Sequence, residues 1–179
     1  MVAVLIAEGF EEIEALTPVD LLRRAGAEVV TVGIGGKYIK GSHGITVECD
    51  MDSKECDADL FDVAVFPGGM PGAVNLDKSP FTDAIISAVS KKSGRLAAIC
   101  ASPLIFGRRG LLVGKRATCY PGFEAELRGA TVVDTAVVTD GLITTGRSMG
   151  GAVEFSLELI ARLKGEDVKE KIAAAIITD

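Results

Sequence analysis

The sequence predicts an α/β fold in which a mostly parallel central sheet carries helices on both faces. Short, nearly continuous apolar runs alternate along the chain with amphipathic stretches. Such apolar runs are typical of parallel strands buried on both faces, and their alternation with helices implies right-handed crossovers. Hydrophobic residues make up 48% of the 179 positions. This is enough to build one core, so we expect a single domain over residues 1–179.

The first half of the chain contains most of the predicted sheet. Its apolar runs predict strands at 2–7, 28–33, 60–66 and 95–100. Amphipathic stretches at 11–25 and 79–92 predict the crossover helices, and each is followed by a glycine that can end it. Between 37 and 49, two short apolar segments flank a Gly-Ser-His-Gly turn and predict a small antiparallel hairpin.

The second half of the chain adds a clearer hairpin and two more helices. At 135–145, an Asp-Gly pair lies between alternating apolar residues, which is a strong signal for a β-hairpin. Helices are predicted at 149–163 and 166–177. In the last helix, apolar residues recur every four positions and should share one face; they are Val168, Ile172 and Ile176.

Charge and composition argue against several classes of function. The net charge is −6, and no basic cluster is larger than an adjacent pair. Binding to nucleic acid or to a membrane is therefore not expected. No export signal is apparent, which predicts a cytoplasmic protein with four reduced cysteines. One histidine and no CxxC pair are too few ligands for a zinc or iron–sulfur site, so no metal or cofactor is predicted.

Three segments follow predicted strands and should meet at one edge of the sheet, where open α/β sheets bind ligands. They are residues 8–14, residues 67–72 and Cys100. Cys100 closes an apolar run and precedes a helix start, the corner at which hydrolases expose a nucleophile. The helix N-terminus is expected to lower the thiol pKa from its usual value of about 8.5. The alternative is a small buried core cysteine.

Two neighbouring segments can support chemistry at Cys100. The backbone N–H groups of Gly69 and Ala101 could hold an oxyanion, although the glycines also suit a tight turn. Glu14 precedes Pro18, so the helix either loosens near Glu14 or begins only at Pro18, with Thr17 as its N-cap. A carboxyl group beside a thiolate should have a raised pKa and could act as a general acid or base.

Two further observations concern the charged residues. Glu11 and Glu12 are interpreted as favourable charge at a helix N-terminus. The single histidine, His43, falls in the small hairpin with no obvious route to Cys100 in the same subunit and is interpreted as a surface residue. A Cys-His-Asp triad, and with it peptidase activity, is therefore not supported.

Taken together, these residues resemble the DJ-1/ThiJ/PfpI superfamily and, within it, the DJ-1-like branch. The resemblance covers essentially the whole chain. The segments that carry it are Gly9-Phe-Glu-Glu-Ile-Glu14, Thr17-Pro-Val-Asp20, Arg23-Arg-Ala-Gly26, Pro67-Gly-Gly69, Gly72-Ala73, Ala97-Ala-Ile-Cys-Ala101, Asp140-Gly-Leu-Ile-Thr144 and Glu154-Phe155. The acidic helix start and the cysteine corner occur in the order and at the spacing of that family.

The resemblance implies a flavodoxin-like three-layer sandwich and a homodimer. It implies Cys100 as a nucleophilic and redox-sensitive thiol, Glu14 as its protonated partner, and the N–H groups of Gly69 and Ala101 as the oxyanion site. Arg147 matches a family arginine near the pocket. Glu11 and His43 match positions that meet across the family's dimer interface, where His43 replaces a more usual arginine.

The main departure from the family pattern is Tyr120. Several members carry a histidine here, whereas tyrosine, with a pKa of about 10, is a poor base at neutral pH. Tyr120 is therefore expected to lie in the pocket without serving as a base, which leaves proton transfer to Glu14. Cys119, beside it, is a candidate resolving thiol for oxidised Cys100.

Three functional hypotheses remain open at this stage. The first is a cofactor-independent glyoxalase or deglycase that acts on small aldehydes or glycated substrates, for example by converting methylglyoxal to lactate. The second is an oxidative-stress sensor or redox-gated chaperone with little turnover, for which Tyr120 is no handicap. The third is an inactive structural homologue.

Overall fold

The central sheet has seven strands in the order β10-β11-β7-β6-β1-β2-β5. The computed structural model describes residues 1–178, so residue 179 of the predicted domain lies outside the described part. The strands are β1 (Val2–Ala7), β2 (Val29–Ile34), β5 (Met51–Asp52), β6 (Val63–Phe66), β7 (Arg95–Ile99), β10 (Val137–Asp140) and β11 (Ile143–Gly146). Only the β10–β11 pair is antiparallel, which confirms both the mostly parallel sheet and the Asp-Gly hairpin.

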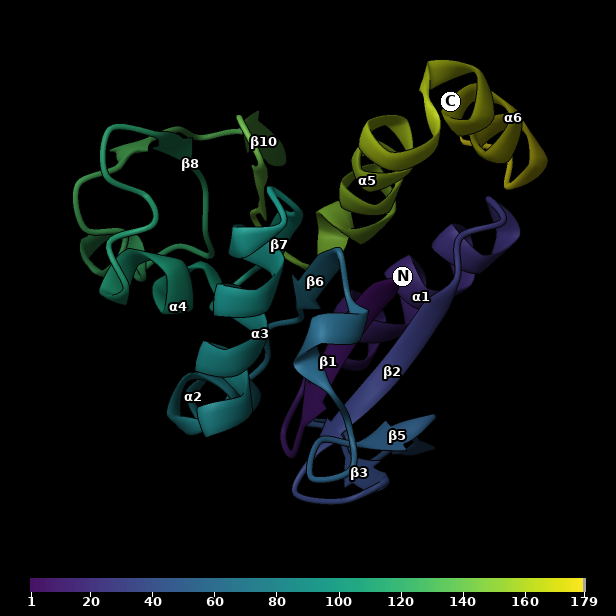
Figure 1. Ribbon diagram of the computed structural model, residues 1–179. Coiled ribbons are helices and arrows are strands. Elements are labelled where there is room, and N and C mark those ends of the chain that lie inside the picture. Colours follow the sequence, from purple (N-terminus) through teal and green to yellow (C-terminus); the bar gives the residue numbers. More distant parts are fainter. Residues whose placement is uncertain (179) are drawn as a thin grey trace.

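Helices cover both faces of this sheet, as Figure 1 shows. The helices α2 (Gly72–Lys78), α3 (Pro80–Lys91) and α4 (Pro103–Arg108) contribute to one buried cluster, and α1 (Glu12–Arg24), α5 (Ala152–Lys164) and α6 (Glu166–Ala175) to the other. Strand β1 joins both clusters because its side chains alternate: Leu5 faces the α2–α4 side, whereas Val4 and Ile6 face the α1 side. The predicted three-layer sandwich is confirmed.

The small elements lie at the margins of the sheet. Strands β3 (Tyr38–Lys40) and β4 (Thr46–Glu48) form the predicted antiparallel hairpin. Strands β8 (Arg116–Ala117) and β9 (Thr131–Val132) form a second two-stranded sheet that the sequence analysis missed, and helix α2 and strand β5 were missed as well. Each of these elements has seven residues or fewer, which is too short for a clear apolar period.

Two boundaries next to Glu14 and Cys100 differ from the predictions. The helix does not begin at Pro18: α1 starts at Glu12 and runs through the proline, which leaves only the carbonyl of Glu14 without its helical donor. Glu14 therefore lies on regular helix rather than on irregular backbone. Strand β7 ends at Ile99, so Cys100 is the first residue beyond the strand. Within residues 1–178, no helix combines the length and the apolar character needed to cross a bilayer.

Candidate active site around Cys100

Cys100 occupies a strained corner between β7 and α4. Its φ of 65° lies in the left-handed region that non-glycine residues rarely adopt. Two backbone hydrogen bonds hold this conformation: the Cys100 N–H donates to Gly146 at 3.0 Å, and the Tyr120 N–H donates to the Cys100 carbonyl at 2.8 Å. The geometry is that of a nucleophile elbow, which turns the side chain away from the sheet.

Glu14 reaches this corner from the first turn of α1. Its side chain is 1% exposed, accepts a hydrogen bond from the Gly68 N–H at 3.0 Å and is hydrogen-bonded to the Cys100 side chain. Burial raises the pKa of Glu14 to about 7, although the hydrogen bonds from Cys100 and Gly68 act in the opposite direction. The sequence-based expectation of a raised pKa agrees with this arrangement.

The pKa of the Cys100 thiol is raised, whereas the sequence predicted that it would be lowered. Burial, followed by the charge of Glu14 and its hydrogen bond, raises the pKa of Cys100 to about 12. The N–H groups of Gly69 and Ala101 lower the thiol pKa but do not outweigh these effects. Two acidic groups in contact cannot both ionise easily, so the pair keeps one proton across neutral pH. The free site therefore holds a thiol that has a base beside it rather than a preformed thiolate.

The proton on Glu14 makes the stability of the fold depend on pH. A carboxyl group whose pKa rises from 4.5 to about 7 on folding binds its proton more tightly in the folded state. Its stabilising contribution is complete below pH 4.5 and is lost as pH rises through 7. The side chain of Glu14→Gln cannot lose a proton, so its free energy of unfolding lacks this pH dependence. Relative to wild type, the free energy of unfolding of the variant is expected to rise by about 1–3 kcal/mol as pH goes from about 5 to about 8.

Urea unfolding at the two pH values measures this difference. The matched control is Glu8→Gln, because Glu8 is an exposed carboxylate near the same helix. A stability difference between wild type and Glu14→Gln that does not change with pH would show that Glu14 stays ionised in the folded protein.

Gly68 and Gly69 allow the glycine-rich turn, residues 67–72, to lie close to Cys100 and to the start of α1. A Cβ on Gly68 would lie 2.6 Å from Glu14 Oε2 and 2.7 Å from the Cys100 Cβ, closer than real Cβ contacts. Gly69 has a φ of 84° and packs directly on the chain at Phe10 and Glu11. Its N–H and that of the buried Ala101 form hydrogen bonds with the Cys100 side chain. These are the two donors that the sequence analysis proposed for an oxyanion.

A cavity of about 510 Å³ opens over the thiol. Five of the predicted site residues besides Cys100 and Glu14 line it: Glu11, His43, Gly69, Ala101 and Tyr120. The cavity is also lined by side chains that the sequence analysis did not single out: Met70, Phe123, Ser148 and Met149. No periodic pattern marks these four residues. Met70 lies within the glycine-rich turn, and Met149 comes shortly after the end of β11. These two positions are the only local features of the sequence that could have indicated cavity residues.

Two residues lie differently from what was expected. Arg147 is not on the wall of this cavity; it is paired with Asp134 and lines a neighbouring cavity of about 320 Å³. His43, by contrast, does reach the Cys100 cavity in the same subunit. The β3–β4 hairpin folds back onto the start of α1, with Gly9 N–H donating to Lys40 and Ser42 N–H to Phe10, both at 2.8 Å.

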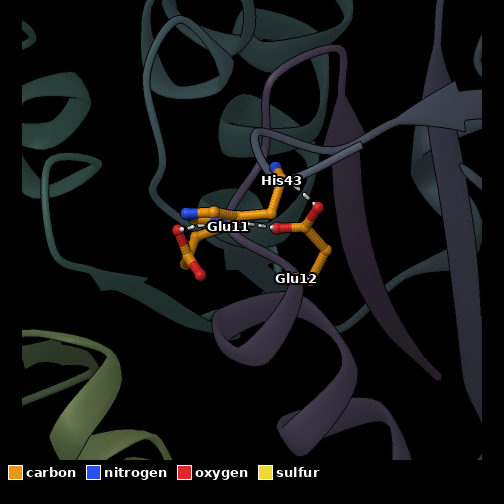
Figure 2. A group of neighbouring side chains, drawn as sticks. All are labelled: Glu11, Glu12 and His43. Carbon is orange, nitrogen blue, oxygen red and sulfur yellow. Dashed lines mark hydrogen bonds and ion pairs between the residues drawn. The ribbon is translucent and has the colours of Figure 1, made fainter. Parts of the chain in front are cut away.

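His43 belongs to a cluster with Glu11, Glu12 and Ser42 at the edge of the cavity, three of whose members are drawn in Figure 2. Burial acts to raise the pKa of Glu12, but hydrogen bonds from the backbone and side chain of His43 outweigh it and lower the pKa. The same hydrogen bond and the charges of Glu11 and Glu12 raise the pKa of His43. His43 is therefore held by carboxylates and makes no hydrogen bond to Cys100 among the described contacts.

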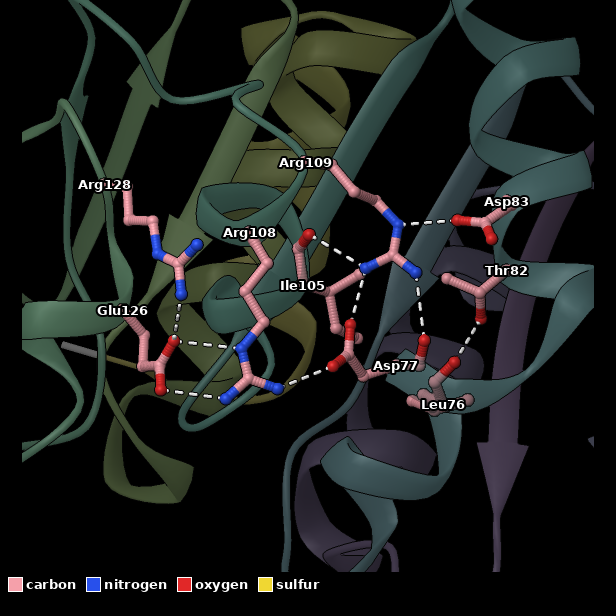
Figure 3. A network of polar contacts seen from close by, with 9 residues as sticks. All are labelled: Leu76, Asp77, Thr82, Asp83, Ile105, Arg108, Arg109, Glu126 and Arg128. Carbon is pink, nitrogen blue, oxygen red and sulfur yellow. Dashed lines mark hydrogen bonds and ion pairs between the residues drawn. The ribbon is translucent and has the colours of Figure 1, made fainter.

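A network of ion pairs connects α2, α3 and α4, which lie next to the glycine-rich turn and the cysteine corner. Asp77, at the end of α2, accepts from Arg108 and Arg109 at the end of α4, and Arg109 also binds Asp83 of α3 at 2.7 Å (Figure 3). At the other end of α4, the Ser102 hydroxyl donates to the Pro67 carbonyl at 2.5 Å. The first set of contacts joins the ends of α2 and α4, and the second joins the cysteine corner to the turn at residues 67–72.

Comparison with known proteins places this chain in a family. Residues 1–162 match the model of the DJ-1/PfpI family. Protein dj-1beta from Drosophila melanogaster is 33% identical over 97% of this chain and 95% of its own. A deglycase from Pyrococcus abyssi is 34% identical over 91% and 99%, and a glutathione-independent glyoxalase from Caenorhabditis elegans is 30% identical over 89% and 86%.

The structural comparison agrees over nearly the full length. The solved structure of oxidised Toxoplasma gondii DJ-1 superposes with a TM-score of 0.94 at 34% identity, covering 98% of this chain and 97% of that chain. The shared fold and the extent of the family match lead to one conclusion: the chain belongs to the DJ-1/PfpI family, in its DJ-1-like branch.

Proposed function

We propose that this protein is a cofactor-independent glyoxalase that converts small 2-oxoaldehydes to 2-hydroxy acids. The observation that carries the proposal is the Cys100–Glu14 pair under the cavity, with the N–H groups of Gly69 and Ala101 at the sulfur. Relatives named as a glyoxalase and as a deglycase support the same chemistry. Action on early glycation products is the neighbouring activity of this type.

The thiol and carboxylate can carry out the reaction in steps that balance. As sulfur adds to the aldehyde carbon, Glu14 accepts the thiol proton and passes it to the aldehyde oxygen, which gives a hemithioacetal. The carboxylate then removes the proton from the former aldehyde carbon and returns it to the neighbouring carbon, while the hydroxyl proton of the hemithioacetal moves to the ketone oxygen. The ketone is thereby reduced to an alcohol, and the aldehyde carbon is oxidised to a thioester. Water hydrolyses the thioester, releasing the hydroxy acid and restoring the thiol.

The donors and the pocket fit these steps. The Gly69 and Ala101 N–H groups, which act on the Cys100 sulfur, would stabilise the negative oxygen that forms beside it when sulfur adds. Glu14 is the only ionisable side chain described in hydrogen-bond contact with Cys100, so the proton transfers fall to it. Tyr120 lies half-exposed on the cavity wall. Incubation with methylglyoxal, without glutathione, is expected to yield lactate; consumption no faster than in buffer contradicts the proposal.

The second candidate is an oxidative-stress sensor. Its support is that Cys100 lies on a cavity beside a buried carboxyl group, which in its protonated form can donate a hydrogen bond to a sulfinate oxygen. Cys49 and Cys119 are only 2% and 5% exposed and line no part of this cavity, so peroxide reaches them less easily than Cys100. Peroxide treatment followed by peptide mass analysis is expected to place oxidation at Cys100 first. Earlier oxidation of Cys56, which is also partly exposed, contradicts this candidate.

A homodimer and a chaperone role remain predictions from the family resemblance, and a cytoplasmic location remains a prediction from the sequence. For the dimer there is one supporting feature, since Ile13 and Leu16 of α1 are 48% and 37% exposed close to the site.

A further inference from the structure

The cluster of Glu11, Glu12, Ser42 and His43 at the edge of the cavity brings four oxygen and nitrogen atoms close together, one from each side chain. These atoms are Glu11 Oε2, Glu12 Oε2, Ser42 Oγ and His43 Nδ1. Ser42 Oγ lies 3.2 Å from the Glu11 oxygen, 3.3 Å from the Glu12 oxygen and 3.0 Å from the His43 nitrogen. The His43 nitrogen lies 3.1 Å from the Glu12 oxygen and 3.5 Å from the Glu11 oxygen.

These contacts cannot all be hydrogen bonds. Two carboxylate oxygens carry no proton, the hydroxyl has one, and the imidazole Nδ1 has at most one. Five close contacts therefore share no more than two hydrogens. Even with His43 protonated, the two carboxylates leave the cluster with a net negative charge. The cluster has an excess of acceptors and negative charge, which a cation at its centre would compensate.

Five of the six spacings among these atoms fit a tetrahedral ion, and the ligand atoms of Glu11, Glu12 and His43 all lie within 4.8 Å of one another. Metal–ligand distances of about 2.0–2.1 Å place tetrahedral ligands about 3.3 Å apart. The five distances of 3.0–3.5 Å cluster around that value. Ca²⁺ and Mg²⁺ require six or more oxygen ligands, whereas one imidazole nitrogen with carboxylate and hydroxyl oxygens suits Zn²⁺.

The fold holds these ligands in place without the ion. The backbone N–H groups of His43 and Ile45 donate to Glu12 Oε1 at 2.9 and 3.4 Å, which leaves Oε2 to face the cluster. Gly41 makes this approach feasible, because a side chain there would overlap the Glu12 carboxylate. Glu12 itself is 5% exposed and cannot rotate freely into solvent.

We infer that Glu11, Glu12 and His43, with Ser42 or a water as fourth ligand, form a binding site for a divalent transition-metal ion such as Zn²⁺ at the edge of the Cys100 cavity. Glu11 and His43 line that cavity, so an open coordination position can accept a carbonyl or carboxylate oxygen of a bound molecule. The sequence analysis predicted no metal because it counted one histidine and treated the two glutamates as helix-end charges.

The test is a Zn²⁺ titration of the full-length protein in competition with a chromophoric chelator. The partly exposed thiols are removed first, with the Cys56→Ser/Cys100→Ala double variant, because thiols bind zinc themselves. This background is expected to bind one Zn²⁺ per chain. His43→Ala and Glu11→Gln are each expected to weaken binding at least about tenfold. Glu8→Gln, a nearby exposed carboxylate outside the cluster, is expected to leave it unchanged.

Three results would overturn the inference: no Zn²⁺ binding by the cysteine-depleted protein, binding that persists unchanged in His43→Ala, or an equal loss in Glu8→Gln. Glu12→Gln is not informative alone because Glu12 also anchors the turn, so the circular dichroism of each variant is recorded. Co²⁺ provides a second readout, since a four-coordinate ion absorbs visible light strongly and a six-coordinate one only weakly. Neither measurement uses aldehyde turnover, so the metal site and the proposed activity fail or succeed separately.

Discussion

Replacement of Cys100 by alanine is expected to lower the rate of methylglyoxal conversion to lactate by at least about 10³-fold. The reason is that the proposed route passes through a carbon–sulfur bond, and no other thiol lines the cavity within the described residues. Alanine fits the site sterically because it only removes the sulfur. The measurement is a time course of lactate formation with wild type and variant at equal concentration.

Cys56→Ser provides the control for this experiment. Cys56 is partly exposed like Cys100 but lines a different cavity, next to α3. Its replacement should leave the rate within a factor of about two, since surface changes away from the site have small effects. Equal turnover by wild type and Cys100→Ala would remove Cys100 from the mechanism and exclude the proposed function. No turnover by either protein would shift the assignment to the oxidation-sensing candidate.

Gly68→Ala is expected to have the second large effect. The added Cβ would lie 2.6 Å from Glu14 Oε2, 2.7 Å from the Cys100 Cβ and 2.9 Å from the Ile99 carbonyl oxygen. These groups belong to a buried strand, a strained corner and a hydrogen-bonded carboxylate, so none can move without breaking other contacts. Overpacking of this kind costs about 1–3 kcal/mol. Displacement of the reacting groups by about 1 Å is expected to lower turnover about 10²-fold.

Urea unfolding and lactate formation together measure both effects. Gly151→Ala is the matched control: its nearest neighbour would be the Ala136 Cβ at 3.6 Å, an ordinary contact, and neither glycine has a positive φ. The control should keep wild-type turnover. If Gly68→Ala kept both the stability and the turnover of wild type, the close approach of Glu14 to Cys100 would not be required.

Local sequence patterns predicted the elements that have long apolar runs or clear stop signals. Strand β1 matches its predicted boundaries, and α1, α3, α6 and the β10–β11 hairpin lie within a few residues of theirs. Short elements such as α2 and β5 were missed. The start of α1 was left open because Pro18 permits two interpretations, and the packing of the buried side of α1 against β1 and α5 decides between them.

The sequence by itself determined that Cys100, Glu14 and the glycine-rich turn would meet. All three follow or flank strands of one parallel sheet, and parallel strands present their carboxyl ends at one edge. Only the tertiary structure decided the protonation of the thiol, because its pKa depends on burial and on the carboxylate of Glu14, 86 positions away in the chain. It likewise decided that His43 reaches the cavity and that Arg147 is turned to Asp134. Both placements depend on how the loops pack against other segments, which no local pattern of residues records.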